Sequence, residues 1–322
     1  MPRKGNQATA ASKPFFSVLD FGIEIAKEKI ENNGEDSYLY SFTPQSGIAG
    51  VFDGCGGSGA KRYEKYRNKT GAYMASRVTA GAAKDWFLER TEEKTPAALK
   101  DKVREYLSIC KQVGGGTATF KGSMAKDYPT TAALVVASIE GGSLMATCLW
   151  AGDSRCYLLD EDGLKQLTDD DLGGIDAMEN LTKDGVLTNV ISASKDFSIH
   201  EKTLEIVKPG ILFAATDGCF GYLSTPMEFE QLLLSTLSGS DTVHDWEEAI
   251  SALLKNIAGD DFTISGMSFE FGSFANLKKS LNQRHRYLYE NFTADISEKT
   301  REEKIALWKK YQIGYSKYLS EG

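Results

Sequence analysis

Short apolar runs separated by glycine-rich turns make up much of the chain and predict a protein rich in β-strands. Such runs occupy residues 15–25, 38–42, 48–52, 130–139, 144–150, 155–159, 164–167, 199–207, 211–215 and 262–271. Their shortness and their β-branched content favour buried strands over helices. Turn dipeptides such as Gly141-Gly142, Gly152-Asp153 and Pro209-Gly210 separate several of them. We therefore expect meanders of antiparallel strands.

Apolar residues at helical spacing predict helices in other parts of the chain. Two predicted helices have apolar faces made of Met74, Val78, Ala82 and Trp86 and of Leu99, Val103, Leu107 and Cys110. Residues 226–237 and 245–257 predict two more, and the charged tail at residues 276–319 is also helical in pattern. Helices are thus expected between and after the groups of strands.

One apolar run, residues 48–52, ends abruptly at Asp53, and a glycine-rich stretch follows it. Alone, this is typical of a turn, because Asp-Gly is a common turn dipeptide. The glycines also match the spacing of a dinucleotide-binding loop, but Asp53 would point a carboxylate at the pyrophosphate, and residues 72–87 are helical where a second strand is needed. A third interpretation is a carboxylate ligand for a hard divalent cation, which requires partners elsewhere.

Further acidic residues stand where predicted strands begin or end, namely Glu35, Asp36, Asp153, Asp217, Asp260 and Asp261. Each alone is typical of a turn, and for the row Asp169, Asp170 and Asp171 we favour helix capping. If the strand ends meet at one edge of the sheets, the acids form an all-oxygen site. Such a site selects Mg²⁺ or Mn²⁺ over softer metals.

Composition and charge exclude several other classes of protein. The chain has 322 residues, enough for one large domain or two small ones, and its net charge of −8 argues against nucleic-acid binding. The five cysteines are scattered and the three histidines are far apart, so neither a disulfide framework nor a zinc site is expected. We find no signal-peptide pattern and no apolar run of about 18 residues, and we expect a cytoplasmic protein without membrane contact.

Short motifs that carry these acids follow one another along the chain. They are Glu35-Asp36-Ser37, Val51-Phe52-Asp53-Gly54-x-Gly56-Gly57, Thr130-Thr131-Ala132, Gly152-Asp153-Ser154-Arg155, Thr216-Asp217-Gly218 and Asp260-Asp261-Phe262-Thr263. In this order the chain resembles the metal-dependent protein phosphatases of the PP2C (PPM) type. Each motif is weak alone, whereas the ordered set is specific.

The resemblance implies an α+β fold, a four-layer αββα sandwich in which two antiparallel β-sheets pack face to face between helices. It assigns residues 14–271 to a phosphatase domain and leaves residues 272–322 as a C-terminal helical extension. Residues 1–13 are small and polar, and we expect them to form a disordered arm.

The implied activity is that of a serine/threonine protein phosphatase, a hydrolase that dephosphorylates proteins and opposes a serine/threonine kinase. The attacking water bridges two Mg²⁺ or Mn²⁺ ions, and a third ion binds more weakly. The motifs imply that Asp53 binds both ions, that the Gly54 carbonyl faces the second ion, and that Asp217 and Asp260 hold the first. They also imply that Glu35 and Asp36 act through metal-bound waters and that Asp153 helps to hold the third ion.

The chain departs from the family pattern at two positions, and more mildly at Asp261, which stands where asparagine is common. Cys55 stands where a histidine that protonates the leaving oxygen is common, and Glu31 stands where an arginine usually binds the phosphate. Lys29, Lys61 or Arg62 are candidates for the missing positive charge. An alternative function is therefore a catalytically weak or inactive relative that binds phosphoproteins or regulates a partner.

Overall fold

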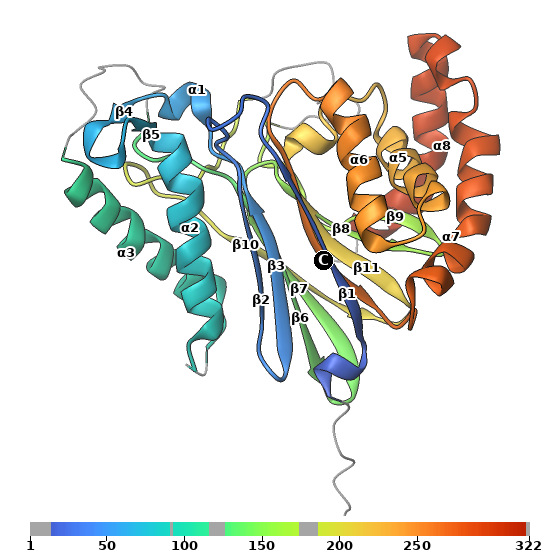
Figure 1. The fold of residues 1–322 in the computed structure, drawn as a ribbon, viewed down its shortest axis with the longest axis horizontal. Coiled ribbons are helices and arrows are strands. Elements are labelled where there is room, and N and C mark those ends of the chain that lie inside the picture. The colour runs from blue at the N-terminus through green and yellow to red at the C-terminus, as the bar shows by residue number, and fades with distance from the viewer. Residues whose placement is uncertain (1–13, 91–92, 116–125, 174–185, 320–322) are drawn as a thin grey trace, which may run out of the picture.

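The computed structural model describes residues 14–90, 93–115, 126–173 and 186–319. Two five-stranded antiparallel sheets pack face to face, and helices cover the outer face of each, which makes four layers (Figure 1). The α+β, αββα sandwich implied by the sequence is therefore confirmed. The predicted disordered arm, residues 1–13, lies outside the described residues.

Each sheet joins strands from distant parts of the chain. The first sheet has the order β1 (Leu19–Lys27), β12 (Phe262–Phe269), β11 (Gly210–Ala215), β8 (Arg155–Asp160) and β9 (Gly163–Gln166). The second has the order β10 (His200–Ile206), β7 (Ser143–Ala151), β6 (Ala132–Glu140), β3 (Ser46–Phe52) and β2 (Ser37–Phe42). A small separate hairpin joins β4 (Arg62–Tyr63) to β5 (Lys69–Thr70).

The predicted meanders are only partly correct, because the chain changes sheets within them. The hairpins β2–β3, β6–β7 and β8–β9 form as expected, but β1 and β2 lie in different sheets, as do β7 and β8, and also β10 and β11, which Pro209-Gly210 joins. The first two of these crossings fall at residues 28–36 and 152–154. Gly152 has a φ of 101°, which side chains disfavour. These two crossings carry acidic residues of the predicted site.

Burial on both faces explains why many strands read as continuous apolar runs. In β3, Ile48 and Phe52 pack against the helices outside the second sheet, whereas Ala49 and Val51 belong to the core between the sheets. Successive side chains of a strand point to opposite faces, so both sets are needed.

The helices divide into two outer layers (Figure 1). Over the second sheet lie α2 (Gly71–Leu88) and α3 (Pro96–Gly114); beside the first sheet lie α5 (Pro226–Gly239), α6 (Val243–Ile257), α7 (Phe274–Leu288) and α8 (Arg301–Leu319). Shorter turns are η1 (Phe15–Ser17), α1 (Gly56–Gly59), η2 (Glu64–Tyr66), η3 (Asp217–Cys219), η4 (Tyr289–Thr293) and η5 (Ile296–Glu298).

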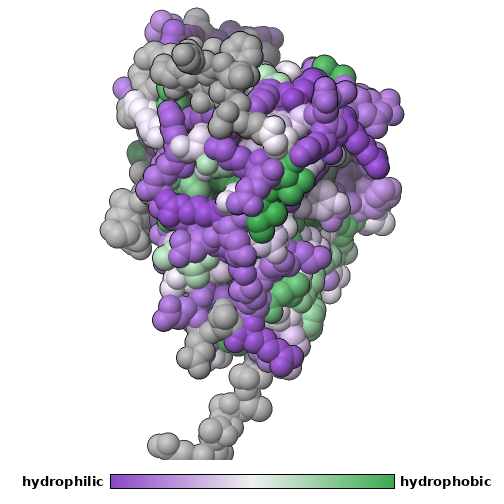
Figure 2. All heavy atoms as spheres, turned by 90° about the vertical axis from the view of Figure 1, so that its left-hand side faces the viewer, coloured by the Kyte–Doolittle hydropathy of each residue, from purple (hydrophilic) through white to green (hydrophobic). Residues whose placement is uncertain are grey.

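The outer surface of α2 and α3 is largely polar. Leu99, Val103, Leu107 and Cys110 are all buried, which confirms the predicted apolar face of α3. Figure 2 shows the opposite, solvent side of this layer, where hydrophilic residues predominate and hydrophobic ones form small groups. Within the described residues, no helix combines the length and the apolar character that a membrane span requires.

A buried ion pair attaches the C-terminal helices to the rest of the fold. The Glu230 side chain on α5 is 0% exposed and accepts two hydrogen bonds from Arg284 on α7, from Nε at 2.6 Å and from Nη2 at 2.9 Å. The Tyr311 hydroxyl of α8 donates to the same carboxylate. Because charges are strongly destabilised when buried without partners, these three residues depend on one another.

We expect Arg284→Met to lower the free energy of unfolding by about 3–5 kcal/mol, because it leaves the Glu230 carboxylate buried without its counter-charge. Urea unfolding followed by circular dichroism measures the change. The matched control is Lys27→Met, which removes a pair with Glu248 whose side chains are 44% and 59% exposed; it should cost less than about 1 kcal/mol. Equal costs for the two variants would contradict the prediction.

Candidate metal centre

The predicted acidic residues gather where the strands of both sheets end. Glu35 and Asp36 precede β2, Asp53 follows β3, and Asp217 follows β11. The remaining members are Asp153, after β7, and Asp260, before β12. This end of the sheets lies beside α1, at the top of Figure 1. The residues are thus brought together from parts of the chain up to about 225 residues apart, as the separation of Glu35 from Asp261 illustrates.

Burial and mutual repulsion raise the pKa values of these carboxyl groups. Burial raises the pKa of Asp53 well above its usual value, and Asp217, Asp36, Asp153 and Asp260 raise it further. The pKa of Asp153 is raised to about 8, mainly by burial and next by the charge of Asp217. The pKa of Asp217 is raised to about 6, mainly by burial and next by the charge of Asp260. The acids are therefore close enough to oppose one another's ionisation.

The arrangement is suited to a cation, although it is not a ready-made set of ligands. Within the described residues, no three Asp, Glu, His or Cys side chains are arranged as a metal site. The Asp153 Oδ1 atom is nevertheless buried without a hydrogen-bond partner among the described residues. Such a buried acceptor is costly unless something satisfies it. The donors here are carboxylate oxygens, which suit Mg²⁺ or Mn²⁺, so the residues fit the implied ions.

Hydroxyl groups hold the two acids that precede β2. Asp36 Oδ2 accepts hydrogen bonds from Thr216 Oγ1 and Thr263 Oγ1, both at 2.8 Å. Burial raises the pKa of Asp36 to about 7, although these two hydrogen bonds act in the opposite direction. Glu35 accepts a hydrogen bond from the Thr70 hydroxyl. Its carboxylate lies so close to Gly56 that a Cβ there would come within 2.2 Å of Oε2, so any side chain at position 56 would require the Glu35 carboxylate to shift.

The main chain around Asp53 is fixed by the residues that precede β6. The Asp53 carbonyl oxygen accepts hydrogen bonds from Thr131 N at 2.8 Å and from Thr130 Oγ1 at 2.7 Å. The Thr131 hydroxyl lies 2.7 Å from that of Ser154, beside Asp153. The threonine motif therefore joins the crossing that carries Asp153 to the strand end that carries Asp53.

Asp261 fixes the crossing that leads to Glu35. Its Oδ1 accepts from Lys29 N at 2.7 Å, and its Oδ2 accepts from Glu35 N at 2.6 Å. The same residue packs against the loop of Asp217, since a Cβ on Gly218 would lie 1.8 Å from the Asp261 carbonyl oxygen. The sequence identified Asp261 only as a departure from asparagine and did not reveal this role.

Cys55 is half-buried next to the acids, and its N–H donates to the Pro129 carbonyl at 3.2 Å. Burial raises the pKa of the Cys55 thiol well above its usual value, and Asp53 and Asp153 raise it further. In the absence of a cation the thiol is therefore protonated at neutral pH. Glu31 lies exposed on a turn.

The positive charges suggested by the sequence have partners. Lys29 Nζ donates to the Ala258 carbonyl at 2.6 Å, and Arg62 Nη1 donates to the Asn68 carbonyl at 2.8 Å. Lys61 Nζ lies 4.8 Å from the centre of the Tyr63 ring. None of these contacts involves a carboxylate of the predicted site, but the Arg62 charge acts on Glu35 and opposes the increase in the Glu35 pKa that burial causes.

Helix capping was the favoured interpretation of Asp169, Asp170 and Asp171. It is wrong for Asp170 and Asp171, whose side chains make other contacts. Asp170 forms a bidentate pair with Arg155, with distances of 2.8 Å to Nε and 2.6 Å to Nη2. Asp171 accepts from Gly152 N at 2.9 Å and lies 2.9 Å from His200 Nε2. Both side chains thus connect this segment to the Asp153 crossing, a long-range role that local spacing does not reveal.

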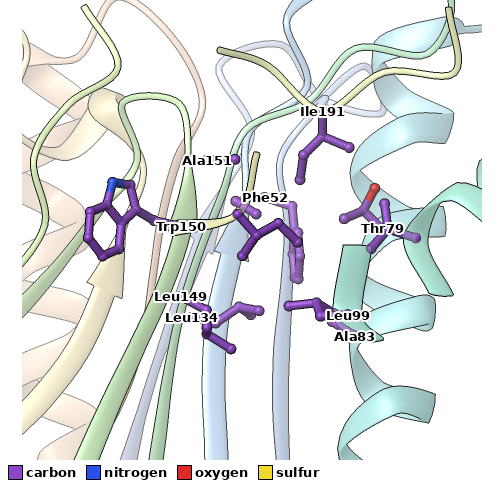
Figure 3. A pocket seen from close by; sticks show the side chains of 12 residues that line it. Phe52, Thr79, Ala83, Leu99, Leu134, Leu149, Trp150, Ala151 and Ile191 are labelled. Atoms are coloured by element: carbon purple, nitrogen blue, oxygen red, sulfur yellow. The ribbon is translucent and has the colours of Figure 1, made fainter. Parts of the chain in front are cut away.

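A cavity near Asp53 is too small to be a substrate site. It has a volume of about 10 Å³ and lies between the second sheet and helices α2 and α3 (Figure 3). Phe52, Leu134 and Leu149 point into it, whereas the Trp150 indole points to the other side of the sheet. A volume of this size is about the minimum for one water molecule.

The pKa values predict that the metal-free protein loses stability as the pH rises from 6 to 8. Asp217, Asp36 and Asp153 have pKa values of about 6, 7 and 8 when folded, against about 3.9 when unfolded. The folded chain therefore holds protons that the unfolded chain has lost, which stabilises it at the lower pH.

Urea unfolding in the presence of a chelator, at pH 6 and pH 8, measures this effect. Asp217→Asn should increase the metal-free stability at pH 8, because it removes one repelling charge. The control Asp241→Asn, at a side chain that is 95% exposed, should change neither value. Equal wild-type stability at both pH values would contradict the prediction.

Comparisons with known proteins agree with the fold. Residues 27–255 match the family model described as Protein phosphatase 2C. No curated protein matches the sequence. Among solved structures, the serine/threonine phosphatase PstP/Ppp of Mycobacterium tuberculosis is 18% identical with a TM-score of 0.56, covering 79% of this chain and 99% of its own.

Two further structures have the same fold. The serine/threonine phosphatase Stp1 from Staphylococcus aureus is 17% identical with a TM-score of 0.59, covering 83% of this chain and 100% of its own. The catalytic domain of PstP in complex with two manganese ions is 17% identical with a TM-score of 0.52, covering 78% of this chain and 98% of its own. These similar proteins are enzymes. The family match extends over most of the sequence, and the chain belongs to the protein phosphatase 2C family.

Proposed function

We propose that this protein is a metal-dependent serine/threonine protein phosphatase that hydrolyses phosphomonoesters on protein substrates. The observation that carries the proposal is the gathering of acidic side chains from several strand ends, with the Asp153 Oδ1 atom buried and unpaired among the described residues. A serine/threonine kinase would supply the substrate. The five free cysteines support a cytoplasmic location.

In this proposal Asp53, Asp217 and Asp260 would hold two Mg²⁺ or Mn²⁺ ions together with the Gly54 carbonyl, and Asp153 would help to hold a third. When bound, the ions lower the pKa of a water molecule and neutralise charge on the phosphoryl group. Glu35 and Asp36 act through water. Their positions are set by Thr70 and by the Thr216 and Thr263 hydroxyls.

Position 55 is proposed to face the leaving oxygen of the substrate. A thiol is a weak hydrogen-bond donor, and in the metal-free protein burial also raises the pKa of Cys55. Cys55 therefore gives up a proton reluctantly. Poor proton donation slows the departure of a serine alkoxide more than that of a stable phenolate.

Cys55 and Glu31 also favour a second candidate, a catalytically weak or inactive member of the family that binds phosphoproteins. Neither residue supplies the proton donor or the positive charge that hydrolysis benefits from. Mn²⁺-dependent release of phosphate from a phosphoserine peptide discriminates between the two candidates, because only the first requires turnover.

Asp53→Asn should lower kcat for a phosphoserine peptide in Mn²⁺ by more than the roughly 10–100-fold typical of residues that act behind a metal ligand. It should also weaken Mn²⁺ binding measured by calorimetry. The control Asp241→Asn, whose side chain is 95% exposed, should retain both properties. An Asp53→Asn protein with wild-type turnover and affinity would exclude the proposed role of this residue.

Cys55→His should raise kcat for the phosphoserine peptide by up to about 10²–10⁴-fold, the usual range of general acid catalysis. It should raise kcat for nitrophenyl phosphate much less, because the phenolate leaves without a proton. The ratio of the two rates is the measurement. An equal change for both substrates would show that position 55 does not serve the leaving oxygen.

A further inference from the structure

A phosphomonoester brings negative charge to a site that is itself acidic, so a positive side chain beside the acids has a clear electrostatic function. Arg155 is close to Asp153 and Asp217, but its guanidinium is engaged by both oxygens of Asp170. Lys29 Nζ binds the Ala258 carbonyl. A cation that has no such partner is therefore the better candidate for an incoming anion.

The segment that begins at Lys126 lies directly against the glycine-rich stretch after Asp53. Lys126 N donates to the Ser58 carbonyl at 3.2 Å, and Cys55 N donates to the Pro129 carbonyl at 3.2 Å. Farther along, Thr130 Oγ1 donates to the Asp53 carbonyl at 2.7 Å. The backbone of Lys126 is thus anchored beside α1, next to the proposed leaving-group side of the site.

The charge of Lys126 acts on this side and is not neutralised within the described part of the chain. Among the charged groups that act on the Cys55 thiol, Asp53, Asp153 and Asp217 are carboxylates and Lys126 is a cation. Lys126 is half-buried, and no described residue forms an ion pair with it. The adjacent Asp127 pairs instead with Lys111 Nζ at 2.9 Å. Within the described residues the Lys126 ammonium group therefore has no carboxylate partner, and its charge acts on Cys55.

We propose that the Lys126 ammonium group binds the phosphoryl oxygens of the substrate on the Cys55 side of the acidic cluster. The inference rests on the proposed phosphatase function and assigns a phosphate-binding residue that the sequence motifs do not include. A flexible lysine is suited to this task, because its ammonium is a compact point charge with rotatable donors.

The test is the binding of inorganic phosphate to the Mn²⁺-loaded protein by calorimetry, together with steady-state kinetics. Lys126→Met should weaken phosphate binding about tenfold or more, the range expected for one charge-assisted hydrogen bond. It should lower kcat/KM equally for a phosphoserine peptide and nitrophenyl phosphate, because both share the phosphoryl group. Lys126→Arg, which keeps the charge, should recover most of the loss.

The control is Lys65→Met, at an exposed lysine of the neighbouring η2 turn, which should leave phosphate binding and kinetics unchanged. Equal phosphate affinity in wild type and Lys126→Met would overturn the inference while leaving the phosphatase proposal intact. Phosphate binding that depends on Lys126 without any hydrolysis would support the inference and contradict the phosphatase proposal. Absence of phosphate binding to the wild type would overturn the inference directly.

Discussion

Repulsion among the clustered carboxyl groups is the constraint on which the rest of the site depends. Asp53 is opposed by four other aspartates, and burial adds to the cost of each charge. A protein can keep such a cluster only if surrounding donors and packing hold it in place. The Thr216 and Thr263 hydroxyls do this for Asp36, and the Asp261 N–H does it for Asp260 at 2.8 Å. Bound cations would reduce the same repulsion.

The sandwich supplies the rigidity that this cluster needs. Because both faces of β3 are buried, a slip of one residue would place Ile48 and Phe52 between the sheets and Ala49 and Val51 under the helices. The register is thereby fixed, and so is the position of Asp53 at the end of the strand. The position of Asp53 is thus determined by the packing of apolar side chains in the strand that precedes it.

Local sequence patterns predicted the helices, the strands and the acidic residues at strand ends, because these features depend on residues that are close in the sequence. The buried face of α3 and the acids beside β3 and β11 lie where expected. The sheet changes after β1 and β7 could not be predicted, since a hairpin and a crossing have the same turn residues. The pairing of Asp170 with Arg155 was missed for a related reason, because the two residues are 15 positions apart in the sequence and only the fold brings them into contact.

Asp261 shows how the surroundings of the site differ from the family pattern while the acids are kept. Each of its oxygens accepts a main-chain N–H, from Lys29 and from Glu35. Asparagine could not make both bonds, because its amide offers one accepting oxygen and an NH₂ group that only donates. The carboxylate therefore holds the crossing more completely, but it also raises the pKa values of Glu35 and Asp36 through its charge. The carboxylate of Asp261 thus holds the main chain with two hydrogen bonds, and its charge adds to the electrostatic repulsion among the carboxylates of the site.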